Sequence, residues 1–392
     1  MNLVSDMSMT RSLSILADLI GHPTVTRQTN LALIEHVRAM LAAQGIASTL
    51  VFDETGTKAN LFASTGPADV PGVVLSGHTD VVPVDGQAWS LEPFTLTQRD
   101  GRLYGRGSAD MKGFIACAVH AMMEASSLRL KRPLQLALSY DEEIGCVGVR
   151  RLLDLLEVAP VRPYLCIVGE PTMMRLATGH KGKTALHATC HGREGHSAQA
   201  PFTVNALHLG CDLVNEVRQL QASISRQGGR DEAYDVPYTT LHVGKFNGGV
   251  ALNIVPNRCE IDFEIRNIAH DDPHALVDVL KAAASRITAQ AQTVVPEARV
   301  EIVEVNSYPG LDTSRTQDAV DFVRSFHPED EVLKLAFGTE GGLFTARLGV
   351  PVVVCGPGSI TQAHKPDEFV EAAQLDQCDA FLAKLLGQLQ AS

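Results

Sequence analysis

Four short apolar segments rich in branched side chains place the strongest constraint on the fold of this chain. They occupy residues 73–76, 134–138, 164–168 and 350–355, and stretches with helical periodicity lie between most of them. This alternation is typical of a largely parallel sheet, because parallel strands need crossover connections and are buried on both faces. The sequence therefore predicts an α/β domain, with a mostly parallel sheet and helices on both faces.

A second pattern begins near residue 178, where apolar and polar residues alternate within the strands. Such strands are predicted at 184–189, 240–246, 258–266 and 299–304, with helices near 205–219 and 273–293. Alternation at every second residue is typical of an antiparallel sheet with one covered face. The first pattern returns after residue 308. We therefore expect an α+β domain of residues 178–307, inserted into a main domain of residues 1–177 and 308–392.

The composition limits the classes of partner. Of 392 residues, 45% are hydrophobic and 20% are charged, as in globular proteins with about two domains. The net charge of -12 argues against nucleic acid or an anionic membrane surface, because both bind clustered Lys and Arg. No apolar run is long enough to span a bilayer, and the N-terminus resembles an amphipathic helix rather than a signal peptide. The 8 cysteines form no CxxC pair, which favours reduced thiols and a cytoplasmic location. The simplest partner is a small-molecule substrate.

The most acidic turn follows the second apolar segment. Asp141, Glu142 and Glu143 are adjacent there. Three neighbouring carboxylates repel one another and need a nearby cation. Alternatively, they only precede a helix, whose N-terminal end favours negative charge. Both interpretations fit these three residues, so the positions of other potential ligands must decide.

Other potential ligands follow the remaining segments. His78 and Asp80 come after the first segment, and Glu170 comes after the third. His364 lies in the loop after the fourth, and Asp110 is predicted to open a helix after a Gly-rich turn. One isolated His after a strand is more often an ordinary surface residue. In an open parallel sheet, however, ligands bind outside the carboxyl ends of the strands. The convergence of these residues therefore predicts a binding site at one edge of the sheet.

The converging side chains are imidazoles and carboxylates, without a thiolate. This mixture suits Zn²⁺ or a similar cation such as Co²⁺ or Mn²⁺. The expected ligands of two divalent metal ions are His78, Asp110, Glu143, Glu170 and His364. Two neighbouring ions need a bridging carboxylate, for which Asp110 is the natural candidate.

Two further acids have no place among the ligands. Asp80 can lie behind His78 and orient its ring, because residues i and i+2 of an extended segment project to the same side. Glu142 remains as a free carboxylate beside its ligand neighbour Glu143. A hydrolase needs such a group to take a proton from water and return it to the leaving amine.

These motifs together resemble those of the M20 metallohydrolases. The motifs are His78-Thr79-Asp80, Gly107-Ser108-Ala109-Asp110-Met111-Lys112-Gly113, Asp141-Glu142-Glu143, Gly169-Glu170-Pro171 and His364-Lys365-Pro366. The resemblance covers nearly the whole chain. It implies a catalytic domain with two zinc ions and an inserted lid or dimerisation domain. It also implies that His78 and Glu170 bind one metal. Glu143 and His364 would bind the other, and Asp110 would bridge the two. Asp80 and Glu142 would form the catalytic pair.

Within that family, several stretches are most similar to the acetylornithine deacetylases. The stretches are 198–201, 248–249, 338–342, 355–360 and 362–369. The resemblance implies removal of the acetyl group from Nα-acetylornithine to give ornithine and acetate, a step of arginine biosynthesis. Succinyl-diaminopimelate desuccinylases, aminoacylases and dipeptidases share the metal ligands and differ in the pocket, so these activities stay open as alternatives.

The resemblance also implies contacts with the substrate. His196 alone resembles an ordinary surface residue, but in similar enzymes this His comes from the partner subunit of a homodimer and stabilises the oxyanion. Asn253 and Arg266 match positions that contact substrate, and a guanidinium suits a substrate carboxylate. Glu340 is expected to bind the side-chain amine of ornithine, or else to be a carboxylate at a helix N-terminus.

Two other classes of protein compete with the hydrolase. A non-catalytic metal-dependent binding protein could keep the ligands but would have no need of Glu142. A nucleotide-binding protein is indicated weakly by Gly105-Arg106-Gly107. However, Asp110 stands where the fingerprint needs its third glycine and would repel an anion. The sequence therefore favours an enzyme. The histidines interpreted as structural are His120, His180, His187, His191, His208 and His242.

Overall fold

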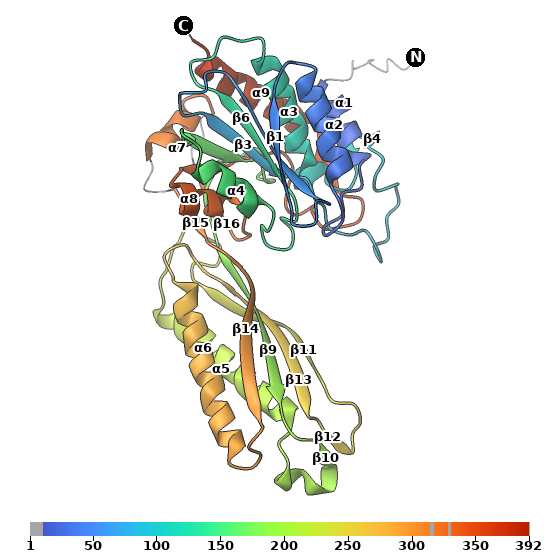
Figure 1. Ribbon diagram of the computed structural model, residues 1–392, viewed down its shortest axis with the longest axis vertical. Coiled ribbons are helices and arrows are strands. Elements are labelled where there is room, and N and C mark those ends of the chain that lie inside the picture. Colours follow the sequence, from blue (N-terminus) through green and yellow to red (C-terminus); the bar gives the residue numbers. More distant parts are fainter. Residues whose placement is uncertain (1–10, 314–316, 328–330, 392) are drawn as a thin grey trace. The chain divides into compact units, whose positions relative to one another are not determined.

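The computed structural model describes residues 11–313, 317–327 and 331–391, and it divides the chain into two compact units (Figure 1). Unit 1 comprises the chain up to Gly179, Leu311–Leu333 and the part from Thr339 onward; unit 2 comprises His180–Gly310 and Lys334–Gly338. The chain therefore passes from one unit to the other after residues 179, 310, 333 and 338.

Unit 1 is built on a mixed sheet. Its strands, in spatial order, are β1 (Ser48–Phe52), β2 (Ala59–Thr65), β6 (Leu134–Ser139), β3 (Val73–His78), β7 (Leu165–Val168), β17 (Val352–Val354), β8 (Ala177–His180) and β15 (Leu311–Asp312). The four central strands, from β6 to β17, are parallel to one another, whereas β1, β2 and β8 pair antiparallel to their neighbours. Each of the four apolar segments identified in the sequence corresponds to one of these central strands. The predicted α/β class is therefore confirmed.

Helices cover both faces of this sheet. Leu75, Leu136 and Ile167 point into a core shared with α1 (Arg11–Ile20), α2 (Leu31–Ala42), α3 (Gly113–Ala125) and α9 (Ala372–Leu389). The alternate side chains Val74 and Cys166 are equally buried but lie outside that core. Helices α4 (Val149–Glu157) and α8 (Gly341–Leu348) pack on the sheet there, on the opposite face in Figure 1. The carboxyl ends of the central strands lead into the loops and turns that carry the predicted ligands.

Shorter elements complete unit 1. They are β4 (Thr97–Arg99), β5 (Arg102–Tyr104) and β18 (Phe369–Glu371), which form a small antiparallel sheet, and the helix α7 (Gln317–Arg324). The strand β16 (Leu333–Leu335) begins at the last residue of this segment of unit 1 and continues into the segment Lys334–Gly338 of unit 2. No helix among the described residues is both long and apolar enough to cross a membrane.

Unit 2 has its own sheet and core. The antiparallel strands, in spatial order, are β11 (Thr240–Gly248), β13 (Arg258–Arg266), β9 (Lys183–His191) and β14 (Arg299–Tyr308). Leu186, Ile261 and Phe263 form a core with residues of α5 (Ala206–Gln227) and α6 (Pro273–Gln292), so one face of the sheet is covered. A two-stranded hairpin-like pair, β10 (Gly195–His196) and β12 (Ile254–Val255), lies beside the short helix η2 (Ser197–Phe202).

Candidate metal centre

The predicted ligands of unit 1 lie where the central strands end. His78 is the last residue of β3, and Glu170 follows β7 after one glycine. The acidic turn follows β6, and His364 lies in the loop between β17 and β18. Since these strands are parallel, residues far apart in the sequence meet at one edge of the sheet.

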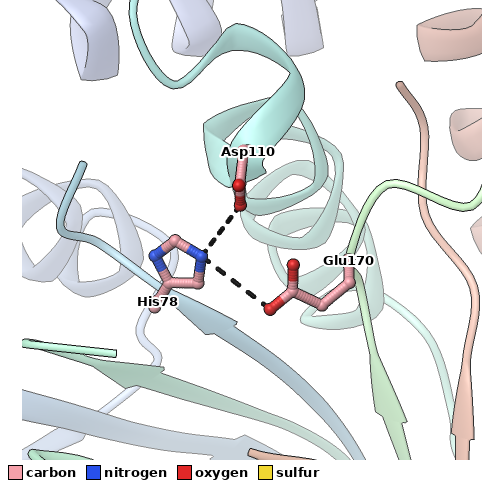
Figure 2. A group of neighbouring side chains, drawn as sticks. All are labelled: His78, Asp110 and Glu170. Carbon is pink, nitrogen blue, oxygen red and sulfur yellow. Dashed lines mark hydrogen bonds and ion pairs between the residues drawn. The ribbon is translucent and has the colours of Figure 1, made fainter. Parts of the chain in front are cut away.

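The first group of ligands is fully enclosed by protein. The Nε2 atom of His78 lies 3.0 Å from Oδ1 of Asp110 and 3.8 Å from Oε1 of Glu170, and all three residues are buried (Figure 2). On its other side the ring donates from Nδ1 to the backbone carbonyl of Asp80, at 2.9 Å. A carbonyl can only accept, so this bond keeps a proton on Nδ1 and leaves the lone pair of the neutral ring on Nε2, where a metal ion could bind.

The second group shares Asp110 with the first. Nε2 of His364 lies 3.0 Å from Oε2 of Glu143 and 3.4 Å from Oδ2 of Asp110. Each oxygen of Asp110 therefore faces a different imidazole. In each group, one ligand atom per residue lies within 4.8 Å of the others. Imidazole nitrogen and carboxylate oxygen are ligands that Zn²⁺ accepts, so the residues fit two ions bridged by Asp110.

The charges of the two groups are strongly coupled. Burial would lower the pKa of His78, but the hydrogen bond to Asp110 and the charge of Glu170 raise it well above its ordinary value. Burial raises the pKa of Glu170 well above its ordinary value, and the charge of Asp110 adds to this effect. For Glu143, burial and then the charge of Asp110 raise the pKa. Carboxylates that oppose one another's ionisation in a buried place are stabilised by cations.

The predicted catalytic pair lies beside these groups. The carboxylate of Asp80 is 3.7 Å from Nδ1 of His78, so the ring is oriented by the backbone oxygen of Asp80. The carboxylate accepts instead from the backbone N–H of Glu142, at 2.9 Å, and from the hydroxyl of Thr26, at 3.0 Å. Burial raises the pKa of Glu142 to about 8. The thiol of Cys146 lies 3.1 Å from Oε1 of Glu142.

Asp141 is the third acid of the turn, to which the sequence assigned no role. Its carboxylate accepts the backbone N–H of Arg27 at 2.8 Å and forms an ion pair with Lys58, and its backbone has φ 52°. These contacts tie the turn to the rest of unit 1. The contacts with Lys58 and Arg27 could not be predicted, because neither residue belongs to a motif. The sequence indicated only that the carboxylate of Asp141 needs a partner.

The prediction that Asp110 opens a helix is wrong. Residues Ser108–Lys112 form an irregular turn in which Asp110 has φ -124° and ψ 90°, and α3 begins at Gly113. In helical geometry the backbone N–H groups here would start to bond within the helix. The irregular turn leaves them directed elsewhere, and it projects the two oxygens of Asp110 toward the two imidazoles.

Three predicted substrate contacts belong to unit 2. His196 is exposed in β10, and its Nδ1 accepts the N–H of Ala198 at 3.1 Å, so a neutral ring carries its proton on Nε2. Asn253 is exposed in the segment before β12. Arg266 ends β13, where its guanidinium donates to Glu264 at 2.9 Å and to the hydroxyl of Tyr308 at 3.2 Å.

Glu340 lies in unit 1 at the N-terminus of α8 and is buried. One oxygen accepts from the hydroxyl of Ser76 and the other from that of Ser139, at 2.8 Å. These serines belong to the neighbouring strands β3 and β6. The carboxylate therefore links α8 with both strands just before their ligand-bearing ends.

Comparison with known proteins gives consistent results for the family. A family model described as peptidase family M20/M25/M40 matches residues 74–388. The acetylornithine deacetylase of Pasteurella multocida (strain Pm70) is 32% identical over 384 residues, 96% of this chain and 97% of that protein. The acetylornithine deacetylase of Myxococcus xanthus is 33% identical over 377 residues, 94% of this chain and 95% of that protein.

Solved structures share the fold at lower sequence identity. An M20 family metallo-carboxypeptidase of Sulfolobus solfataricus has a TM-score of 0.78 and 18% identity, over 96% of this chain and 99% of that chain. A dinuclear metal-binding peptidase of the M20 family from Bacillus subtilis has a TM-score of 0.66 and 15% identity, over 97% of this chain and 98% of that chain. At these identities the likeness concerns the fold alone.

Proposed function

Because this chain belongs to the peptidase family M20/M25/M40, whose members are hydrolases, we propose that it is a dinuclear metal-dependent deacetylase acting on Nα-acetylornithine. The observation that carries the proposal is the position of Asp110, whose two oxygens face the imidazoles of two separate ligand groups. Similarity to two acetylornithine deacetylases along nearly the whole chain supports the choice of substrate.

The ligand sets in the proposal follow the two groups. His78, Asp110 and Glu170 would hold one ion, and Asp110, Glu143 and His364 the other. Two bound Zn²⁺ or Co²⁺ ions would polarise the amide carbonyl and make a water molecule more acidic. Asp80 keeps the ring of His78 in the correct tautomer through its backbone carbonyl.

Glu142 is the proposed general base and acid. Its carboxylate is half-buried in the same turn as Glu143, and the backbone N–H of Glu142 is fixed by the carboxylate of Asp80. Glu142 takes a proton from the attacking water and then returns it to the nitrogen of the leaving amine. A binding protein would keep the ligands, but it would gain nothing from a further carboxylic acid placed beside them.

Unit 2 supplies the substrate contacts in this proposal. His196 with its proton on Nε2 is a hydrogen-bond donor, as the stabilisation of an oxyanion requires. The guanidinium of Arg266 suits the α-carboxylate of the substrate, and Asn253 offers an amide. We further propose that unit 2 is the dimerisation domain and that His196 acts in the site of the partner subunit. The exposed apolar side chains Phe202 and Leu252 support an interface there.

Arginine biosynthesis in the cytoplasm is the proposed setting. Among the described residues the eight cysteines form no disulfide, and seven of them are buried, which is consistent with a reducing compartment.

A substrate panel tests the reaction. Acetylornithine, succinyl-diaminopimelate, acetyl-methionine and a dipeptide are compared with and without a chelator. We expect acetylornithine to be hydrolysed with the highest kcat/KM, and chelation to abolish turnover. Preference for another member of the panel would assign the chain to the desuccinylases, aminoacylases or dipeptidases of the family. Full activity in the presence of the chelator would overturn the metal-dependent mechanism.

The Glu142→Gln variant tests the proton transfer. We expect kcat to fall by a factor of about 10² to 10⁴, the usual contribution of general acid–base catalysis. Metal content must equal that of the parent, so that loss of an ion is not the cause. Glu35→Gln, at an exposed position on α2, is the matched control and should keep full activity. Near-normal turnover of Glu142→Gln with both ions bound would contradict the role of Glu142 in proton transfer.

Glu340 has two proposed roles that one variant separates. The buried contacts with Ser76 and Ser139 support a role in joining β3, β6 and α8, whereas the earlier expectation was binding of the ornithine amine. If Glu340 joins these elements, Glu340→Gln lowers kcat/KM for acetylornithine and acetyl-norleucine by the same factor. A selective loss for acetylornithine would instead identify Glu340 as the partner of the amine.

A further inference from the structure

Glu368 is a buried carboxylate that the proposed reaction does not use. It lies four residues after His364, at the end of the loop that leads into β18, and it is 1% exposed. A carboxylate without hydrogen-bond partners would be strongly destabilising at such a position. The donors that compensate for its burial therefore show what Glu368 holds in place.

The donors belong to residues 106–110, a segment that ends at Asp110. Oε1 accepts the backbone N–H groups of Ala109, at 2.9 Å, and of Asp110 itself, at 3.1 Å. Oε2 accepts the backbone N–H of Gly107, at 3.0 Å, and a guanidinium N–H of Arg106, at 2.8 Å. A carboxylate has about four acceptor sites, so its capacity is filled by this one short segment.

A second chain of contacts joins the same two segments. The guanidinium of Arg106, itself buried, donates to the side-chain oxygen of Gln87. The amide of Gln87 then donates to the backbone carbonyl of His364, at 3.0 Å. The backbone carbonyl of Glu368 also accepts the N–H of Gly105, at 3.0 Å. The loop from His364 to Glu368 is thus attached at both of its ends to the segment that leads to Asp110.

We propose that Glu368 is a positioning residue that sets the bridging Asp110 and the ligand His364 in their mutual geometry. Asp110 and His364 are separated by more than 250 residues of chain, and the carboxylate of Glu368 attaches the loop of His364 to the segment of Asp110. The proposal rests on the proposed dinuclear site and extends it. The ion held by Asp110, Glu143 and His364 depends on Glu368 for its affinity, although Glu368 does not touch that ion.

The chemistry of a Gln side chain at this position explains the expected effect. A Gln keeps one acceptor oxygen but replaces the other by an NH₂ group, which would face donors only. Two of the four hydrogen bonds are lost, and Arg106 keeps its charge without an anionic partner at Glu368. The turn then relaxes and Asp110 moves relative to His364. Residues that orient metal ligands typically change metal affinity by about 10–100-fold when mutated.

The experiment measures metal binding directly. Parent, Glu368→Gln and Glu368→Asp are stripped of metal and titrated with Co²⁺, with binding followed by visible absorption and by calorimetry. Glu371→Gln is the matched control, because Glu371 lies three residues further on and pairs with Arg102 at the surface, at 3.0 Å. Melting temperatures of the metal-free proteins separate a general loss of stability from a change at the site.

We expect the parent to bind two Co²⁺ ions, and we expect Glu371→Gln to bind them with the same two affinities as the parent. In Glu368→Gln one of the two affinities should fall by at least tenfold, and excess Co²⁺ should restore turnover. Glu368→Asp keeps the charge and covers the case in which Glu368→Gln does not fold; it should show a smaller loss of the same affinity. Unchanged affinities in either folded Glu368 variant would overturn the positioning role alone. Fewer than two ions bound by the parent would overturn the proposed dinuclear site itself.

Discussion

At the scale of single residues, the buried acids at the sheet edge divide into two kinds. Asp110, Glu143 and Glu170 direct their oxygens at the imidazoles. Others accept hydrogen bonds from backbone or side-chain donors and hold the loops that carry the ligands; these are Asp80, Asp141, Glu340 and Glu368. Both kinds are conspicuous in the sequence as acids near apolar segments, but only their contacts distinguish them.

Asp141 should contribute strongly to stability. Its ion pair with Lys58 is nearly buried, with side-chain exposures of 13% for Lys58 and 8% for Asp141. We expect Asp141→Ala to lower the free energy of unfolding by about 3–5 kcal/mol, the usual cost of breaking a buried pair. Denaturant unfolding of the metal-free protein measures this loss. Lys58→Met in addition should restore part of it, since the uncompensated ammonium is removed.

A surface pair provides the contrast for that measurement. Glu35 and Arg38 on α2 are about half exposed. Glu35→Ala should change stability by about 1 kcal/mol or less, as for other exposed ion pairs. Equal effects of Glu35→Ala and Asp141→Ala would contradict the role of the buried pair in holding the acidic turn.

Metal binding should release protons. Hydrogen bonds to Asp110 and Glu143 raise the pKa of His364 to about 10, so the ring is protonated at neutral pH in the metal-free protein. Its Nε2 proton must leave before an ion binds, and the apparent affinity should rise by about tenfold per pH unit for each proton released. The rise continues with pH until the pKa of the metal-free ring is reached.

Calorimetric titrations at one pH in buffers of different ionisation enthalpy count these protons. We expect at least one per protein at pH 7, and His364→Ala should release fewer. A metal affinity that is independent of pH between 6 and 8 would show that His364 does not lose a proton when the metal ion binds.

At the scale of elements, strands and helices with a regular apolar pattern could be predicted from the sequence, whereas irregular segments could not. Strand β13 was predicted at 258–266 and is observed there, because every second residue is apolar and faces the helices. The pair β1 and β2 was not predicted, since β1 is half-exposed and lacks a clear alternation. Helix α5 runs to Gln227, beyond the predicted 219, because Ile224 adds a further buried turn.

The site follows the same division. The convergence of the candidate ligands could be predicted because strand ends in a parallel sheet meet at one edge. The turn around Asp110 could not, since its backbone is held by Glu368, a residue more than 250 positions away. The partners Lys58, Thr26 and Cys146 carry no recognisable motif, and their contacts exist only in the folded chain.

The close approach of α3 to the end of β7 gives an element-scale prediction. A Cβ atom on Gly169 would lie 1.8 Å from the ring of the buried Phe114. Gly169→Ala should therefore push α3 away from β7 and shift the adjacent Glu170. We expect a loss of about 1–3 kcal/mol in stability, as for other overpacked cores, and weaker binding of the ion held by Glu170.

Gly387 in α9 is the matched control, because a Cβ atom there meets nothing within 4 Å. Gly387→Ala should leave stability unchanged or raise it by up to about 1 kcal/mol, since Ala favours the helix. Thermal unfolding and metal content of both variants check the prediction. A Gly169→Ala protein as stable as the parent would show that Phe114 can yield without disturbing β7.

At the scale of the whole molecule, each unit has its own hydrophobic core, and all candidate metal ligands belong to unit 1. We expect two calorimetric unfolding transitions. Added metal should raise the transition temperature of unit 1 only. The free energy of unfolding of unit 1 should rise by about 2.7 kcal/mol at a free metal concentration 100 times Kd. A single transition, or an equal shift of both, would contradict the independence of the two cores.

The position of β17 in the sheet has a consequence for the order in which a growing chain can assemble its site. β17 pairs with β7 on one side and β8 on the other, yet unit 2 separates it from both in the sequence. His78, Asp110 and Glu170 have all been synthesised before unit 2 begins, whereas His364 emerges from the ribosome only after unit 2 is finished. The nascent protein therefore has all three candidate ligands of the first group long before it has those of the second.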